Sequence, residues 1–263
     1  MLGKLMKYEF KATGRIFLPL FAALVVLAGA DRLLSALNFH AAQGIDVFIF
    51  VMLAAGLFVV TLVITLQRFR NNLFKDEGYL MFTLPVRTDS LILSKLFVSV
   101  IWVAASAVTV LVSALMLSVR TLPAELWDGI QKALNALRPQ GFYAALSLAE
   151  LLLMEVVSLF AGILTLYASM ALGLLVNRHR GLLSFGAFVV LGVVQQLILS
   201  GAAAVNSALR NVNLSDGPGL PDGLSVYVQI QPAGLMGILF WCAIAAGLYF
   251  LTRHLLNRRL NLE

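Results

Sequence analysis

Long apolar runs recur along the whole chain, and they restrict its fold more than any other feature. An α-helix rises about 1.5 Å per residue, so about 20 apolar residues cross the hydrocarbon core of a bilayer. Hydrophobic residues make up 60% of the 263 and charged residues only 12%, roughly half of the ~25% found in soluble domains. The alternation typical of membrane barrel strands is not visible. The sequence therefore predicts an all-α integral membrane protein.

The apolar runs predict six transmembrane helices within a single transmembrane domain that covers residues 1–263. The segment 206–232, which precedes the last span, contains several Gly and Pro residues. Two interpretations of it remain, because it either re-enters the membrane or caps a pathway from outside. The six spans are about 16–34, 45–66, 91–119, 148–176, 182–205 and 233–252.

The distribution of basic residues predicts the orientation of these spans. Most of the 19 Lys and Arg residues lie in segments on the same side of the membrane as the N-terminus. Cytoplasmic segments are enriched in Lys and Arg, and an even number of spans returns the chain to the side on which it starts. The sequence therefore predicts that both termini are cytoplasmic.

Residues 2–15 predict an amphipathic elbow helix before the first span. Such a helix lies in the plane of the lipid headgroups. Two roles remain open for it, a simple topogenic anchor and an elbow that transmits motion. Its basic residues share one helical face and its apolar residues the opposite one; the basic set is Lys4, Lys7, Lys11 and Arg15, and the apolar set is Leu2, Leu5, Met6 and Phe10.

The segment 67–90 interrupts the apolar pattern between the second and third spans. We expect Asn71-Asn72 to end the second helix. Asp76 and Glu77 suit the first turn of a new short helix, because carboxylates are stabilised near helix N-termini. Pro85 disfavours helical geometry in the residue before it and so ends that short helix. Thr88 or Asp89 then caps the next helix, which continues into the third span.

This short helix carries aromatic and aliphatic side chains where water is expected. Exposed apolar groups of this kind mark either a membrane contact or a protein interface. The residues alone leave both interpretations open: the helix dips into the inner headgroup region, or it is a docking surface for a cytoplasmic partner. The side chains concerned are Tyr79, Leu80, Met81 and Phe82.

The stretch 76–86, DEGYLMFTLPV, and the following stretch 91–95, LILSK, resemble the first cytoplasmic loop of type-2 ABC exporter permeases. In that family an acidic residue and a glycine precede a short run that ends in Leu-Pro, and a lysine follows at the start of the third span. The six spans, the cytoplasmic ends and the basic N-terminal helix are similar to the family in layout. The motif itself covers only residues 67–95.

The resemblance implies that 75–85 is a coupling helix, inserted into a groove of a separate ABC ATPase subunit. It also implies that ATP and Mg are bound by that partner, and that this chain is not an enzyme and binds no cofactor. A second permease copy or paralogue would complete the complex in the bacterial cytoplasmic membrane. The residues that the resemblance assigns to ATPase coupling are Asp76, Glu77, Gly78, Tyr79, Leu80, Phe82, Leu84 and Pro85.

Motifs for other chemistry are missing from the sequence. It contains no phosphate-binding P-loop, no His-Glu-x-x-His zinc motif and no Gly-x-Ser-x-Gly nucleophile elbow. We therefore expect no catalytic residues and no metal ligands, and the placement of the basic residues favours membrane topology over nucleic acid as the reason for the positive charge.

Three polar residues within the spans remain as candidate pathway or helix-interface residues. A carboxylate at the depth of Glu155 is costly in lipid, so it should face protein or a wet cavity or be protonated. The adjacent amides of Gln195 and Gln196 need partners in hydrocarbon. The leading hypothesis is a permease subunit of an ATP-driven exporter. The alternatives are an ATPase-independent channel or carrier that uses Glu155, and a membrane anchor or sensor without transport.

Overall fold

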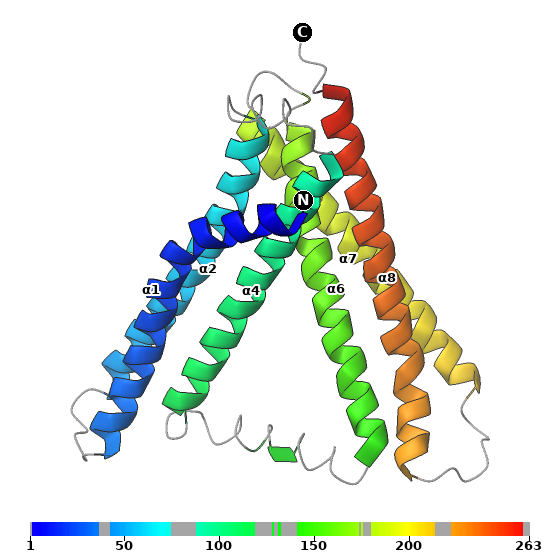
Figure 1. Ribbon diagram of the computed structural model, residues 1–263. Coiled ribbons are helices and arrows are strands. Elements are labelled where there is room, and N and C mark those ends of the chain that lie inside the picture. The colour runs from blue at the N-terminus through cyan, green and yellow to red at the C-terminus, as the bar shows by residue number, and fades with distance from the viewer. Residues whose placement is uncertain are drawn as a thin grey trace. The chain divides into compact units, whose positions relative to one another are not determined.

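The computed structural model describes residues 2–36, 43–74, 88–118, 128, 131–132, 141–173, 175, 180–213 and 222–259, and these ranges contain helices but no strand. The all-α prediction is therefore confirmed for the described part of the chain. The long helices are α1 (Leu2–Ala36), α2 (Gln43–Phe74), α4 (Thr88–Ser118), α6 (Gly141–Gly173), α7 (Arg180–Asn213) and α8 (Asp222–Arg259) (Figure 1).

Among the residues that the structure describes, six helices are long and apolar enough to cross a membrane, as the sequence predicted. Each apolar stretch overlaps the corresponding expected span, and together they indicate a multi-pass membrane protein. Their bounds are Gly3–Leu33, Phe48–Phe69, Asp89–Leu117, Ala145–Gly173, Gly181–Val205 and Gly234–Leu256.

The N-terminal helix is continuous. The expected elbow helix, 2–15, and the expected first span, 16–34, both lie within α1, and no break in the helix separates them. In Figure 1 the darkest blue part of α1, at the N-terminus, runs at an angle to the rest of the helix. The start of α1 and its apolar part therefore belong to one helix, in which Pro19 lacks the N–H that would donate to the carbonyl group of Arg15.

The end of α2 differs from the prediction. Asn71-Asn72 do not end the helix, which continues to Phe74. Asn costs less than about 1 kcal/mol per residue relative to Ala in a helix interior. Two such residues do not outweigh the hydrogen bonds that continuation supplies to the last carbonyl groups. α4 starts at Thr88, with Asp89 in its first turn, where the sequence predicted the start of the helix, and the cap by either residue stays a prediction.

The chain divides into two compact units, Met1–Glu125 and Leu126–Glu263. In the first unit α1 packs along α4, and both also contact α2. Phe17, Leu24 and Leu57 form its buried core, with Trp102 and other partly buried apolar residues around them. This packing holds one end of α1 beside the end of α2 and the start of α4.

In the second unit α6 packs against both α8 and α7. Small side chains line its buried face, including Ala161 and Ala168, which lets neighbouring helices approach closely. Two glycines of α8 likewise lie close to side chains of α6. A Cβ atom added at Gly237 would lie 2.8 Å from Met154 Sδ, and one added at Gly234 would lie 3.0 Å from Glu150 Oε2.

We expect Gly237→Leu to destabilise the second unit by about 1–3 kcal/mol, because overpacking forces neighbouring side chains out of their preferred rotamers. Gly247→Leu is the matched control on the same helix, since nothing lies within 4 Å of a Cβ atom there. Thermal unfolding of the full chain in detergent measures the difference. Equal unfolding temperatures for the two variants would contradict the close approach of α6 and α8.

Candidate functional site

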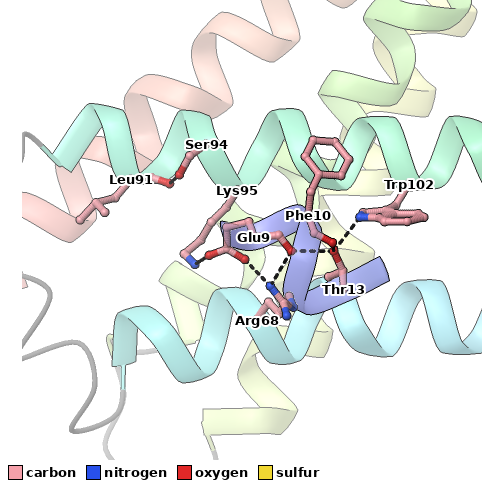
Figure 2. A network of polar contacts seen from close by, with 8 residues as sticks. All are labelled: Glu9, Phe10, Thr13, Arg68, Leu91, Ser94, Lys95 and Trp102. Atoms are coloured by element: carbon pink, nitrogen blue, oxygen red, sulfur yellow. Dashed lines mark hydrogen bonds and ion pairs between the residues drawn. The ribbon is translucent and has the colours of Figure 1, made fainter. Parts of the chain in front are cut away.

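The carboxylate of Glu9 lies between two basic side chains from two other helices. Glu9 is on α1, and its Oε1 accepts a hydrogen bond of 2.7 Å from Lys95 Nζ on α4. Its Oε2 forms an ion pair with the guanidinium of Arg68 on α2. Figure 2 shows the two cations pointing toward Glu9 from opposite sides. One carboxylate thus connects three helices.

This charged cluster is largely withdrawn from solvent. The Lys95 side chain is 3% exposed, the Glu9 side chain 12% and the Arg68 side chain 27%. Removing one partner from a buried ion pair is strongly destabilising, because it leaves charge in a poorly solvated place. Here the two cations share one carboxylate, so Glu9 is the member on which both ion pairs depend.

A second set of contacts fixes the same face of α1 against α4. Trp102 Nε1 donates a hydrogen bond of 2.7 Å to Thr13 Oγ1. The Thr13 hydroxyl in turn donates to the carbonyl oxygen of Glu9 over 2.7 Å. The Trp102 ring stacks on Phe17, with ring centroids 4.6 Å apart and an interplanar angle of 12°. The indole N–H of Trp102 and the hydroxyl of Thr13 are therefore both hydrogen-bonded.

Helical spacing explains why these residues meet. Glu9, Thr13 and Phe17 follow one another at intervals of four and so lie on one face of α1. Lys95 and Trp102 are seven residues apart, about two turns, and so share a face of α4. We call Glu9, Arg68, Lys95, Thr13 and Trp102 the α1 junction. It lies beside the last turns of α2 and the first turns of α4.

The α1 junction is a set of contacts between helices. It contains no paired nucleophile and base, and no group of His, Cys, Asp and Glu residues that could hold a metal occurs among the residues that the structure describes. The α1 junction connects α1 to both α2 and α4. In the sequence, these two helices lie directly before and after the segment 75–87.

The residues that the resemblance assigns to ATPase coupling lie outside the described part of the chain. Their assignment therefore stays a prediction. They are Asp76, Glu77, Gly78, Tyr79, Leu80, Phe82, Leu84 and Pro85.

The other candidate residues are in the second unit, and only one of them contacts another helix through a described hydrogen bond. Gln195 Nε2, on α7, donates a hydrogen bond of 2.9 Å to Thr165 Oγ1 on α6. Gln196 is exposed on α7, and Glu155 is exposed on α6. The carbonyl oxygen of Glu155 accepts a hydrogen bond from Ser158 Oγ. Gln195 is thus at a helix–helix contact, and the structure does not bring Glu155 to the two amides.

Sequence reasoning missed most of the α1 junction. The family resemblance includes Lys95, and the sequence predicts no partner for Arg68, Thr13 or Trp102. One signal was available: Glu9 is the single acidic residue in the otherwise basic stretch 2–15. Comparisons with protein-family models, with curated proteins and with solved structures found no match to this chain.

Proposed function

We propose that this chain is the permease subunit of an ATP-driven exporter in the bacterial cytoplasmic membrane, where it converts hydrolysis in a separate ATPase subunit into substrate efflux. The observation that carries the proposal is the placement of Glu9. It pairs with Arg68 on α2 and with Lys95 on α4, the two helices on either side of the segment that resembles a coupling helix.

The proposed mechanism follows from this connection. A displacement of the segment 75–85 by the ATPase subunit pulls on the end of α2 and on the start of α4. Arg68 lies six residues before the last residue of α2, and Lys95 seven residues after the first residue of α4. Through the two ion pairs α1 moves with both helices, so that the first unit responds as a group.

The remaining parts of the complex come from partners. The ATPase subunits bind ATP and Mg, and a second permease copy or paralogue supplies the other half of the pathway. Both termini of the chain are cytoplasmic in this arrangement. Six membrane-spanning helices also suit a channel, a carrier or a sensor, and the experiment below separates those alternatives from the proposal.

Co-purification tests the proposal directly. The full chain is tagged in its native host and purified from membranes in a mild detergent, so that an ATP-binding subunit made by the same cells can remain bound. We expect the ATPase to remain bound and to hydrolyse Mg-ATP. A chain that is recovered folded and without any bound ATPase would favour the ATPase-independent alternatives.

Labelling of single cysteines tests the orientation of the proposed permease. In a Cys242→Ser background, cysteines at positions 75, 179 and 258 should resist a membrane-impermeant thiol reagent in intact cells, because the proposed orientation puts these positions in the cytoplasm. Cysteines at positions 128 and 216 should react. Permeabilised cells are the control, since all five positions should then be labelled. Labelling of position 179 in intact cells would overturn the six-span orientation.

A further inference from the structure

The first four turns of α1 carry a row of exposed cations. Lys4, Lys7, Lys11 and Arg15 are all exposed, and none forms an ion pair with any other residue in the part of the chain that the structure describes. Tyr8 lies within the same row and is 72% exposed. These five residues are called the basic face of α1 below.

The α1 junction fixes the direction in which this face points. Lys11 and Thr13 are two residues apart, which is about 200° around a helix. Thr13 is 2% exposed and Phe17 only 1%, because both pack toward α4. Rotating α1 would break the ion pairs of Glu9 and expose these side chains. The basic face is therefore held away from α2 and α4.

The basic face also lies next to the apolar part of the same helix. The α1 stretch Gly3–Leu33 is long and apolar enough to cross a membrane, and the cations occupy its N-terminal end. Lys and Arg side chains at such a position extend their charged groups to the headgroup region. Tyr8 suits the same depth, since Tyr is enriched at membrane–water interfaces.

We infer that the basic face of α1 binds the phosphate groups of anionic phospholipids in the leaflet at the N-terminal end of α1. Between Lys4 and Arg15 the row is about 16 Å long at ~1.5 Å per residue, so it can contact several headgroups side by side. No acidic residue of the same stretch neutralises this charge. Glu9 is the only acid between residues 2 and 15, and it pairs with Arg68 and Lys95 on the other face of α1. The inference does not depend on the proposed transport function.

Lipid selectivity measured on the full chain tests the inference. The protein is reconstituted in phosphatidylcholine vesicles that contain a trace of pyrene-labelled phosphatidylglycerol or pyrene-labelled phosphatidylcholine, and energy transfer from its Trp residues is recorded. We expect the anionic probe to be preferred about tenfold at 20 mM salt, because each basic residue near the surface adds to the attraction. The preference should fall toward unity at 0.5 M salt, where screening is strong.

The variant Lys4→Gln/Lys7→Gln/Lys11→Gln/Arg15→Gln should lose this preference while keeping the unfolding temperature of the wild type, since all four side chains are exposed. Two controls should keep the preference. Lys4→Arg/Lys7→Arg/Lys11→Arg retains the charge, and Arg32→Gln removes an exposed cation near the other end of α1.

Three results would overturn the inference. The first is an equal response to both probes in the wild type, which would indicate contact through acyl chains only. The second is a preference that survives in the four-Gln variant. The third is a preference that inorganic phosphate abolishes and sodium chloride of the same ionic strength does not, which would identify free phosphate and not a lipid headgroup as the ligand.

Discussion

Glu9→Gln is expected to destabilise the full chain by about 3 kcal/mol. The amide keeps the size of the side chain but removes the negative charge that lies between Arg68 and Lys95. Lys95 is 3% exposed, so its charge has little access to water. Loss of one member of a buried ion pair typically costs 3–5 kcal/mol. Thermal and denaturant unfolding in detergent measure the change.

Lys95→Met is the matched control for this prediction. It removes the most buried charge and leaves Glu9 paired with Arg68, which is 27% exposed and reaches solvent. We therefore expect a smaller loss of stability than for Glu9→Gln. The double variant Glu9→Gln/Lys95→Met should be more stable than Glu9→Gln alone, because the two residues interact directly. If Glu9→Gln unfolds like the wild type, the ion pairs do not hold α1 in place.

Tyr79→Ala/Phe82→Ala is expected to remove most of the bound ATPase subunit if residues 75–85 are the coupling helix. Aromatic anchors at the centre of an interface cost about 2 kcal/mol or more when they are truncated. A loss of 1.4 kcal/mol corresponds to a tenfold weaker affinity, so a double truncation should weaken binding more than tenfold. The measurement is the amount of ATPase that co-purifies, normalised to the amount of permease in the membrane.

Two comparisons make this result specific. Tyr79→Phe/Phe82→Leu keeps apolar side chains of similar size and should retain most of the ATPase. Glu9→Gln should lower the unfolding temperature even without the ATPase, whereas Tyr79→Ala/Phe82→Ala should leave it unchanged. A double truncation that retains its ATPase as firmly as the wild type would show that 75–85 is not the coupling helix.

The helices could be predicted from the sequence because the cost of burying polar backbone in lipid leaves few alternatives. A run of about 20 apolar residues has to satisfy its hydrogen bonds internally, and a helix does so. Helix ends depend on smaller energies. α2 continues through Asn71-Asn72 to Phe74. The helix propensity of Asn is lower than that of Ala by about 1 kcal/mol or less per residue, which is too little to predict where the helix ends.

The α1 junction could not be predicted because its partners are far apart in the chain. Glu9 is 59 residues from Arg68 and 86 from Lys95. The charge pattern predicts that many cations lie on the same side of the membrane, and nothing in that pattern distinguishes Arg68 and Lys95 from the others. Only the packing of α1 along α4 brings Lys95 and Trp102 opposite Glu9 and Thr13. The interactions follow from the tertiary contacts and not from the local pattern.

This separation along the chain has a consequence for biosynthesis. Glu9 is made early, its first partner, Arg68 on α2, follows 59 residues later, and its second partner, Lys95 on α4, is made 86 residues later. At a synthesis rate of about 5–20 residues per second, the interval is roughly 4–17 s. Until then Glu9 can pair with Arg68 alone, so only one of its two ion pairs can form. The α1 junction is therefore completed only after the first turns of α4 have been made, and before that point α2 alone offers Glu9 a partner.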